Sequence, residues 1–140
     1  MIRKATMDDI DIINKLGSIL HDNFVNVFHM ETEIDNKDAI ILVYEDINVV
    51  AYLYAINTID NIDLLSIVVD DSYKRNGIAT KLVNYLIGNY CYRDKTITLE
   101  VDVYNIPALK FYEKLGFKLV NVRKKYYNDH DAYLMKWGIE

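Results

Sequence analysis

The residues from 64 to 87 constrain the fold of this chain more than any other stretch. Residues 64–69 (LLSIVV) form a short apolar and β-branched run, which predicts a buried strand. Polar residues 70–76 follow as a turn, and apolar side chains then recur at helical spacing at Leu82, Val83, Leu86 and Ile87. The sequence therefore predicts a strand, a loop and a helix in direct succession.

The loop carries the first chemical signal, because Gly77 and Ala79 stand where the helix should begin, beside Lys74 and Arg75. Glycine lets a ligand approach the backbone, and the first N–H groups of a helix have no partner inside it. A phosphate fits such a site. Neither G-x-x-x-x-G-K-[ST] nor G-x-G-x-x-G is present. These residues alone leave two readings open, a phosphate site of another kind and an ordinary glycine turn.

Length and charge narrow the class of protein. The 140 residues fit one domain spanning 1–140, and 51% hydrophobic with 26% charged residues is typical of a globular chain. The net charge of −5 argues against a nucleic acid partner, because it gives no broad basic surface. Cations gather at residues 74–75 and 123–125, which favours a small anionic ligand.

Cysteine usage and the lack of long apolar runs favour a cytoplasmic protein. Cys91 is the single cysteine, so no disulfide within the chain is expected, and a small buried residue is the preferred interpretation. The sequence has no apolar run of ~18 residues and no signal-type start, so we expect no membrane association. The histidines at 21, 29 and 130 are too widely spaced to predict a metal site.

Periodicity predicts a mixed α/β (α+β) chain with the order βααβββαβαββ, about seven strands and about four helices. Strands are expected at 2–5, 39–44, 49–55, 62–69, 96–103, 117–122 and 132–137, and helices at 10–20, 24–33, from 78 onward and at 106–115. The two strand–helix–strand units in the second half imply a partly parallel sheet with helices on its faces.

The strand at 96–103 alternates, so that Glu100 and Asp102 share one side of it. Asn105 is a good N-cap for the helix that follows, and Pro107 is tolerated in its first turn. Gly116 is placed to end that helix.

Two segments resemble the GNAT acetyltransferases. Residues 74–79 (KRNGIA) resemble the [Q/R]-x-x-G-x-[G/A] loop, although lysine replaces the usual Gln or Arg. Residues 99–117 (LEVDVYNIPALKFYEKLGF) resemble the segment L-E-V-x-x-x-N-x-x-A-x-x-x-Y-x-x-x-G-F, and residues 123–127 resemble R-R-x-Y-Y. Residues 99–117 and 123–127 are similar to the RimI-type ribosomal-protein alanine acetyltransferases, which modify protein N-termini.

The resemblance implies a GNAT fold and acetyl-coenzyme A as cosubstrate. It assigns Glu100 as general base and Tyr112 as general acid. The chemistry agrees, because the attacking amine must lose a proton and the departing thiolate must gain one. It also implies a backbone N–H of residues 67–69 as the oxyanion donor. The implied cofactor-binding residues are Ile67, Val68, Val69, Lys74, Arg75, Asn76, Gly77, Ile78, Ala79, Thr80 and Asn105.

The acceptor side is less specific. In GNAT proteins the region around residues 21–28 forms one wall of the acceptor site, which implies Phe24 and Phe28, and the loop near Tyr126 and Tyr127 holds the peptide. Asn128 stands where a proline is common. The implied partner is a protein N-terminus, with a ribosomal protein as one candidate, and the chain is expected to be a monomer or homodimer.

Other interpretations of the same residues stay open. A glutamate on the polar side of a strand, such as Glu100, is often only solvated, and a tyrosine on an amphipathic helix, such as Tyr112, often belongs to the core. Tyr126 and Tyr127 could likewise be aromatic residues that pack at the end of a strand. The acceptor could be a small amine or a lysine side chain. The chain could also bind acetyl-coenzyme A without catalysis and regulate a partner.

Overall fold

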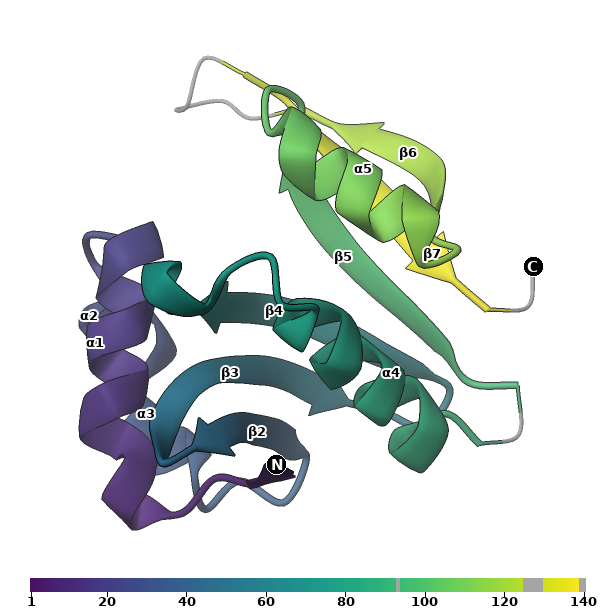
Figure 1. The fold of residues 1–140 in the computed structure, drawn as a ribbon. Coiled ribbons are helices and arrows are strands. Elements are labelled where there is room, and N and C mark those ends of the chain that lie inside the picture. The colour runs from purple at the N-terminus through teal and green to yellow at the C-terminus, as the bar shows by residue number, and fades with distance from the viewer. Residues whose placement is uncertain (93, 125–129, 139–140) are drawn as a thin grey trace. The chain divides into compact units, whose positions relative to one another are not determined.

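The computed structural model describes residues 1–92, 94–124 and 130–138 (Figure 1). The strands are β1 (Ile2–Lys4), β2 (Ala39–Asp46), β3 (Asn48–Asn57), β4 (Asn61–Val69), β5 (Thr96–Asp102), β6 (Lys118–Arg123) and β7 (Ala132–Trp137). The helices are α1 (Ile10–Leu20), α2 (Phe24–Phe28), α3 (Met30–Glu33), α4 (Ile78–Tyr90) and α5 (Ile106–Lys114), with short 3-10 turns η1 (Met7–Asp9) and η2 (Asp71–Tyr73).

The chain forms two compact units. The first contains residues 1–57 and 64–90, and the second contains residues 58–63 and 91–140. Strand β4 contributes to both, residues 64–69 to the first and residues 61–63 to the second. The hydrogen-bonded strand order is β1-β2-β3-β4-β5-β7-β6.

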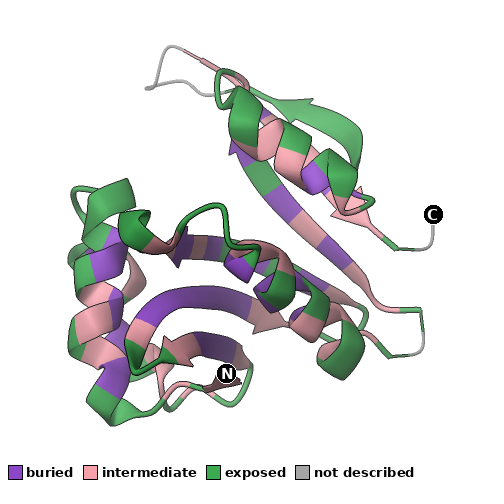
Figure 2. Cartoon of the chain, in the orientation of Figure 1, coloured by how far each residue is buried: buried purple, intermediate pink, exposed green. Residues whose placement is uncertain are grey.

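The β2–β3 hairpin is the centre of the first unit. Val43 lies opposite Tyr52 and Leu42 opposite Leu53, and such neighbouring pairs point to opposite faces of the hairpin. Val43 and Tyr52 pack in a core with residues of α1, α2 and α3. Leu42 and Leu53 point to the other face, and α4 also packs on β2 and β3. Covered on both faces, β3 is buried over six consecutive residues (Figure 2).

Close packing of α1 on α2 depends on Gly17. A Cβ atom added there would lie 2.5 Å from the ring of Phe24, which is fully buried. No real Cβ tolerates that distance from an immobile ring, so glycine is required for this contact.

The second unit is built around β5. Its first residues pair in parallel with the start of β4, where Ile62 lies opposite Ile97. Its whole length pairs antiparallel with β7, where Leu99 lies opposite Met135, and β7 also pairs antiparallel with β6. The sheet is thus partly parallel, as expected. However, β7 separates β5 from β6, so only the unit formed by β4, α4 and β5 joins neighbouring parallel strands.

The predicted element order is confirmed, with two differences in detail. The expected loop at 45–48 is reduced to Ile47, whose φ of 66° allows Asp46 to pair with Asn48. The expected helix at 24–33 is broken at His29, which has a φ of 50° and separates α2 from α3. In one continuous helix Phe24 and Met30 would point about 120° apart. The break lets both side chains enter the same core.

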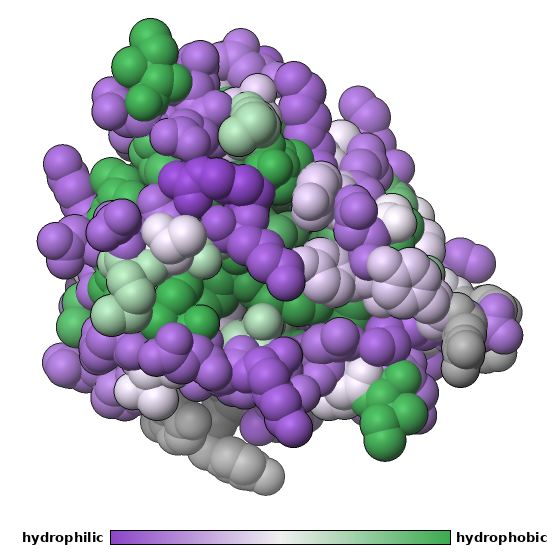
Figure 3. All heavy atoms as spheres, turned by 90° about the horizontal axis from the view of Figure 1, so that it is seen from below, coloured by the Kyte–Doolittle hydropathy of each residue, from purple (hydrophilic) through white to green (hydrophobic). Residues whose placement is uncertain are grey.

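Exposed hydrophobic side chains occur mainly outside the cores. Ile47 and Ile59 are almost fully exposed in turns. On the face seen in Figure 3, hydrophilic side chains make up much of the surface, and some hydrophobic side chains project from it. No helix in the described ranges has both the length and the apolar character needed to span a bilayer.

Candidate active site

The loop between β4 and α4 folds through its own polar side chains. The Asp70 carboxylate accepts hydrogen bonds from the Ser72 N–H at 2.9 Å and from the Ser72 hydroxyl at 2.7 Å. These bonds hold the carboxylate ionised and lower the pKa of Asp70. The Asn76 amide donates to the Tyr73 carbonyl at 3.2 Å. The turn is thereby fixed before the helix begins.

The backbone in front of α4 presents a row of unused donors. Arg75 and Gly77 both have positive φ, 68° and 74°, and the helix begins at Ile78. Among the described residues, no acceptor is found for the N–H groups of residues 75–80, whereas the Lys81 N–H bonds the Gly77 carbonyl. Free N–H groups at a helix start, together with the helix dipole, form an anion site.

The two cations of this loop are exposed. Lys74 forms an ion pair with Asp71 at 2.8 Å, and both side chains are more than half exposed. Such a surface pair contributes little to stability, so Lys74 can exchange it for a ligand phosphate at small cost. Ile78 is buried and anchors the helix start, while Ala79 and Thr80 are half-buried.

The strand before the loop offers backbone groups. Among the described residues, the ladder between β4 and β5 pairs Asn61–Asp63 and does not extend to Ile67, Val68 and Val69. The Val68 side chain is buried in the core of the first unit.

In the second unit, Glu100 lies on the polar side of β5, as alternation predicts. Its carboxylate is 2.7 Å from the Arg123 guanidinium of β6, and about a third of the glutamate side chain is exposed. The sheet allows this contact because Ala132 of β7 lies opposite both Asp102 and Arg123. Glu100 is therefore held in place by a cation yet is open to solvent.

Helix α5 positions Tyr112. The helix begins at the cap that the sequence predicts, where the Asn105 side-chain oxygen accepts the Ala108 N–H at 3.2 Å. Tyr112 is only 8% exposed, and its ring packs at 5.0 Å from Phe111 and 5.4 Å from Phe117, between ring centroids. Burial raises the pKa of Tyr112 to about 12, so the phenol stays protonated at neutral pH.

A second polar pair lies beside Glu100. The His130 Nδ1 atom is 2.6 Å from the Asp102 carboxylate, and the Tyr104 ring packs edge-on against the imidazole at 5.2 Å. The other Asp102 oxygen accepts the Tyr104 N–H. The sequence shows that Glu100 and Asp102 share a side, but it gives no sign that each meets a basic partner.

The predicted acceptor residues differ in their placement. Phe24 is fully buried, so its side chain offers no surface to an acceptor and belongs to the core. Phe28 is half-buried and contacts Phe24, Tyr54 and His21 through its ring. Tyr126 and Tyr127 lie outside the described residues.

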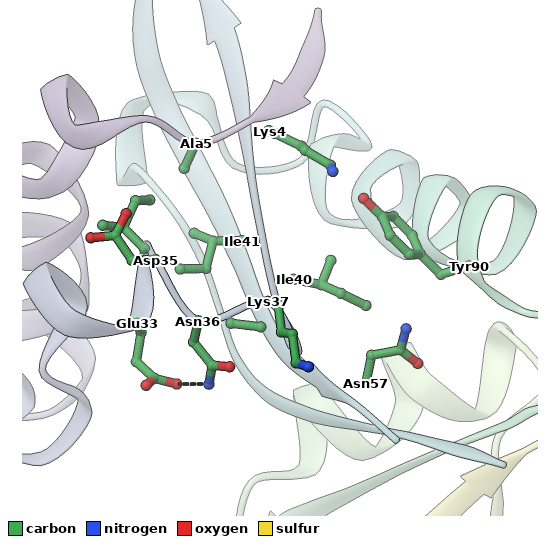
Figure 4. Close-up of a pocket in the computed structure, with 12 residues that line it drawn as sticks. Lys4, Ala5, Glu33, Asp35, Asn36, Lys37, Ile40, Ile41, Asn57 and Tyr90 are labelled. Atoms are coloured by element: carbon green, nitrogen blue, oxygen red, sulfur yellow. Dashed lines mark hydrogen bonds between the residues drawn. The ribbon is translucent and has the colours of Figure 1, made fainter. Parts of the chain in front are cut away.

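A cavity of about 280 Å³ lies elsewhere in the first unit (Figure 4). It is lined by Lys4, Lys37, Ile40, Asn57 and Tyr90, among others, and the polar ends of Lys4 and Tyr90 point toward each other. Tyr90 is the last residue of α4, whereas Gly77 precedes the first, so about 20 Å of helix separates the cavity from the glycine loop. None of the predicted site residues that the structure describes lines this cavity.

The comparisons with known proteins agree with one another. The profile of the Acetyltransferase (GNAT) family matches residues 11–117. An N-alpha-acetyltransferase of Saccharolobus solfataricus is 37% identical over 150 aligned residues, covering 96% of this chain and 90% of that protein. The [ribosomal protein bS18]-alanine N-acetyltransferase of Escherichia coli is 36% identical over 75 residues, covering 53% of this chain and 51% of that protein.

A solved structure shows the same fold. The crystal structure of the ribosomal-protein-S18-alanine N-acetyltransferase from Escherichia coli superimposes with a TM-score of 0.86. The alignment covers 100% of this chain and 94% of the other, at 24% sequence identity.

Proposed function

The chain belongs to the GNAT acetyltransferase family and is an acetyl-CoA-dependent N-acetyltransferase. We propose that it acetylates the α-amine of protein N-termini. The observation that carries this proposal is the likeness to an N-alpha-acetyltransferase along almost the whole of both chains. A ribosomal protein is one candidate substrate, because a second relative is named for ribosomal protein bS18.

The glycine loop is the proposed site for the pyrophosphate of acetyl-CoA. The unpaired N–H groups of residues 75–80 supply donors, and Lys74 and Arg75 supply positive charge. The backbone of Ile67, Val68 and Val69 would bind the pantetheine arm, and one of its N–H groups would stabilise the oxyanion. Asn105 caps α5 and would also reach the cofactor with its amide nitrogen, which bonds none of the described residues.

The proposed chemistry is direct attack without a covalent enzyme intermediate. Glu100 removes a proton from the acceptor ammonium, directly or through water, which frees the nitrogen lone pair. The nitrogen attacks the thioester carbonyl, the N–C bond forms, and the C–S bond breaks. Tyr112 then protonates the departing thiolate, a role that suits a phenol kept neutral by burial. The nitrogen loses its second proton as the amide forms, and this proton returns through water to the Tyr112 phenolate. Phe28, Tyr126 and Tyr127 remain the proposed acceptor contacts.

An acceptor screen tests this assignment. Peptides with a free α-amine and varied first residues are mixed with acetyl-CoA and the enzyme, and thiol release is followed. Matched peptides carry a blocked N-terminus and an internal lysine. We expect turnover only with a free α-amine, and mass spectrometry of the product locates the acetyl group.

Two other results would point to other functions. Acetylation of lysine side chains or small amines alone would remove the N-terminal assignment. If the parent protein bound acetyl-CoA but turned over no acceptor, a regulatory binding role would be favoured. In an enzyme, Glu100→Gln should keep acetyl-CoA binding while losing turnover.

A further inference from the structure

The pair formed by His130 and Asp102 has no role in the chemistry above. Asp102 ends β5, and His130 lies just before β7. The 2.6 Å contact places the Asp102 carboxylate on Nδ1 of the imidazole. An Nδ1–H that bonds a carboxylate leaves Nε2 as the free proton acceptor. Nε2 has no hydrogen-bond partner among the described residues, and about a third of the His130 side chain is exposed.

This pair is a neighbour of the proposed base. Glu100 and Asp102 are two residues apart on β5, so they share a face and are separated by about 6.6 Å along the strand. Across the sheet, Ala132 lies opposite Asp102, which brings the start of β7 to the same place. The Asp131 carbonyl accepts the Val103 N–H at 3.1 Å and fixes the chain beside His130.

A carboxylate is a weak base for the proton of an ammonium group, so a stronger base behind it favours the transfer. An α-ammonium group has a pKa of about 8, a glutamate side chain about 4 and an imidazole about 6.5 in model peptides. An imidazole is therefore much closer in basicity to the amine that must be deprotonated. Glu100 in addition already accepts a hydrogen bond from Arg123.

We propose that His130, oriented by Asp102, is a proton relay for the acetyl transfer. The proton leaves the acceptor ammonium for the Glu100 carboxylate, passes through water to Nε2 of His130, and is released to solvent from the exposed imidazole. The proton is conserved at each transfer, and Asp102 stabilises the imidazolium while it lasts. This relay rests on the proposed function, since it needs an ammonium acceptor.

The charged groups around the imidazole can be named. Asp102 faces it from β5, Tyr104 packs on it from the turn that follows, and Asp131 is its chain neighbour and is 3.8 Å from Lys124. The Glu100–Arg123 pair lies one step further along the same face. Asp102 alone among the described residues contacts a ring nitrogen of His130.

The test compares His130→Ala with the parent, using the best peptide acceptor, between pH 6 and 9. We expect kcat to fall about tenfold or more at neutral pH, with the KM for the peptide little changed. The pH profile of kcat between pH 6 and 9 should differ in shape between His130→Ala and the parent. Millimolar imidazole added to the buffer should restore part of kcat in His130→Ala and leave the parent unaffected.

A matched pair of variants separates the relay from a structural link between β5 and β7. Asp102→Asn and Asp131→Asn make the same chemical change on either side of His130. Only Asp102→Asn should lower kcat, because only Asp102 holds the ring. If His130→Ala has the same kcat as the parent, the relay is overturned. The relay is also overturned if the variant loses kcat together with a lowered Tm and added imidazole restores none of the lost kcat. If the parent acetylates no peptide N-terminus, the proposed function itself fails.

Discussion

Among single residues, Tyr112 gives the sharpest prediction, because its burial has two separate effects. The apolar surroundings fix the ring and raise the pKa of the phenol to about 12. Tyr112→Phe should keep the packing and lower kcat about a hundredfold, since only the proton donor is removed. In the parent, ionisation of the Tyr112 phenol should begin to reduce kcat only when the pH rises above about 11. Steady-state thiol release across pH measures both, and a Phe variant with parental kcat would exclude Tyr112 as the acid.

Single residues also mark the limit of prediction from sequence. Strand alternation and helix capping are local properties, so the sequence predicts the side of the strand that carries Glu100, the cap at Asn105 and the helix that carries Tyr112. Arg123 and His130 lie 23 and 28 positions from their carboxylate partners, and only the pairing of β5, β7 and β6 brings them together. The family resemblance implies an acceptor role for Phe24, whereas its full burial against Gly17 places it in the core.

At the scale of elements, the glycine before helix α4 and the glycine inside it should respond in opposite ways to the same change. Gly77 precedes the helix with a φ of +74°, and an added Cβ would meet no atom within 4 Å. The cost of Gly77→Ala is therefore backbone strain, about 1 kcal/mol of unfolding free energy. Gly88 lies inside the helix with open space around it, so Gly88→Ala should stabilise by about 0.5–1 kcal/mol.

Urea unfolding measures these opposite signs, and calorimetry with coenzyme A adds a functional measure. Only Gly77→Ala should weaken binding, because the strained backbone carries the unpaired N–H groups of the loop. Equal binding in both variants would argue against an anion site at the start of α4.

Helices and strands are predicted well where the apolar periodicity is strong, and less well where the backbone conformation of a single residue turns the chain. The order of strands and helices follows from alternation and helical spacing. The break at His29 could not be predicted, because the pattern of apolar residues does not indicate a positive φ at a histidine. This conformation is stabilised by the burial of Met30 in the core. The placement of β7 between β5 and β6 is also a tertiary choice.

For the molecule as a whole, charge sets the response to acid. The chain has 21 acidic and 16 basic residues, and its most buried carboxylate is Asp9 among the described residues. Arg3 donates two hydrogen bonds to Asp9, at 2.8 and 3.0 Å, and the Thr6 N–H donates a third at 2.8 Å. The bonds from Arg3 are the main cause that lowers the pKa of Asp9 below the ordinary 3.8. They also connect β1 to the start of α1.

A carboxyl group whose pKa is lowered by folding stabilises the protein at any pH above the pKa that the group has in the unfolded chain. This contribution is lost as the pH falls through the pKa that the group has in the folded protein. Asp9→Asn should therefore cost about 2 kcal/mol of unfolding free energy at pH 7. The difference from the parent should shrink below pH 3.8, where the unfolded parent binds the proton first. Urea unfolding between pH 7 and 2.5 measures both values, with Asp11→Asn, at an exposed position of α1, as the control. A difference that stays constant over this range would mean that Asp9 acts through packing rather than through its charge.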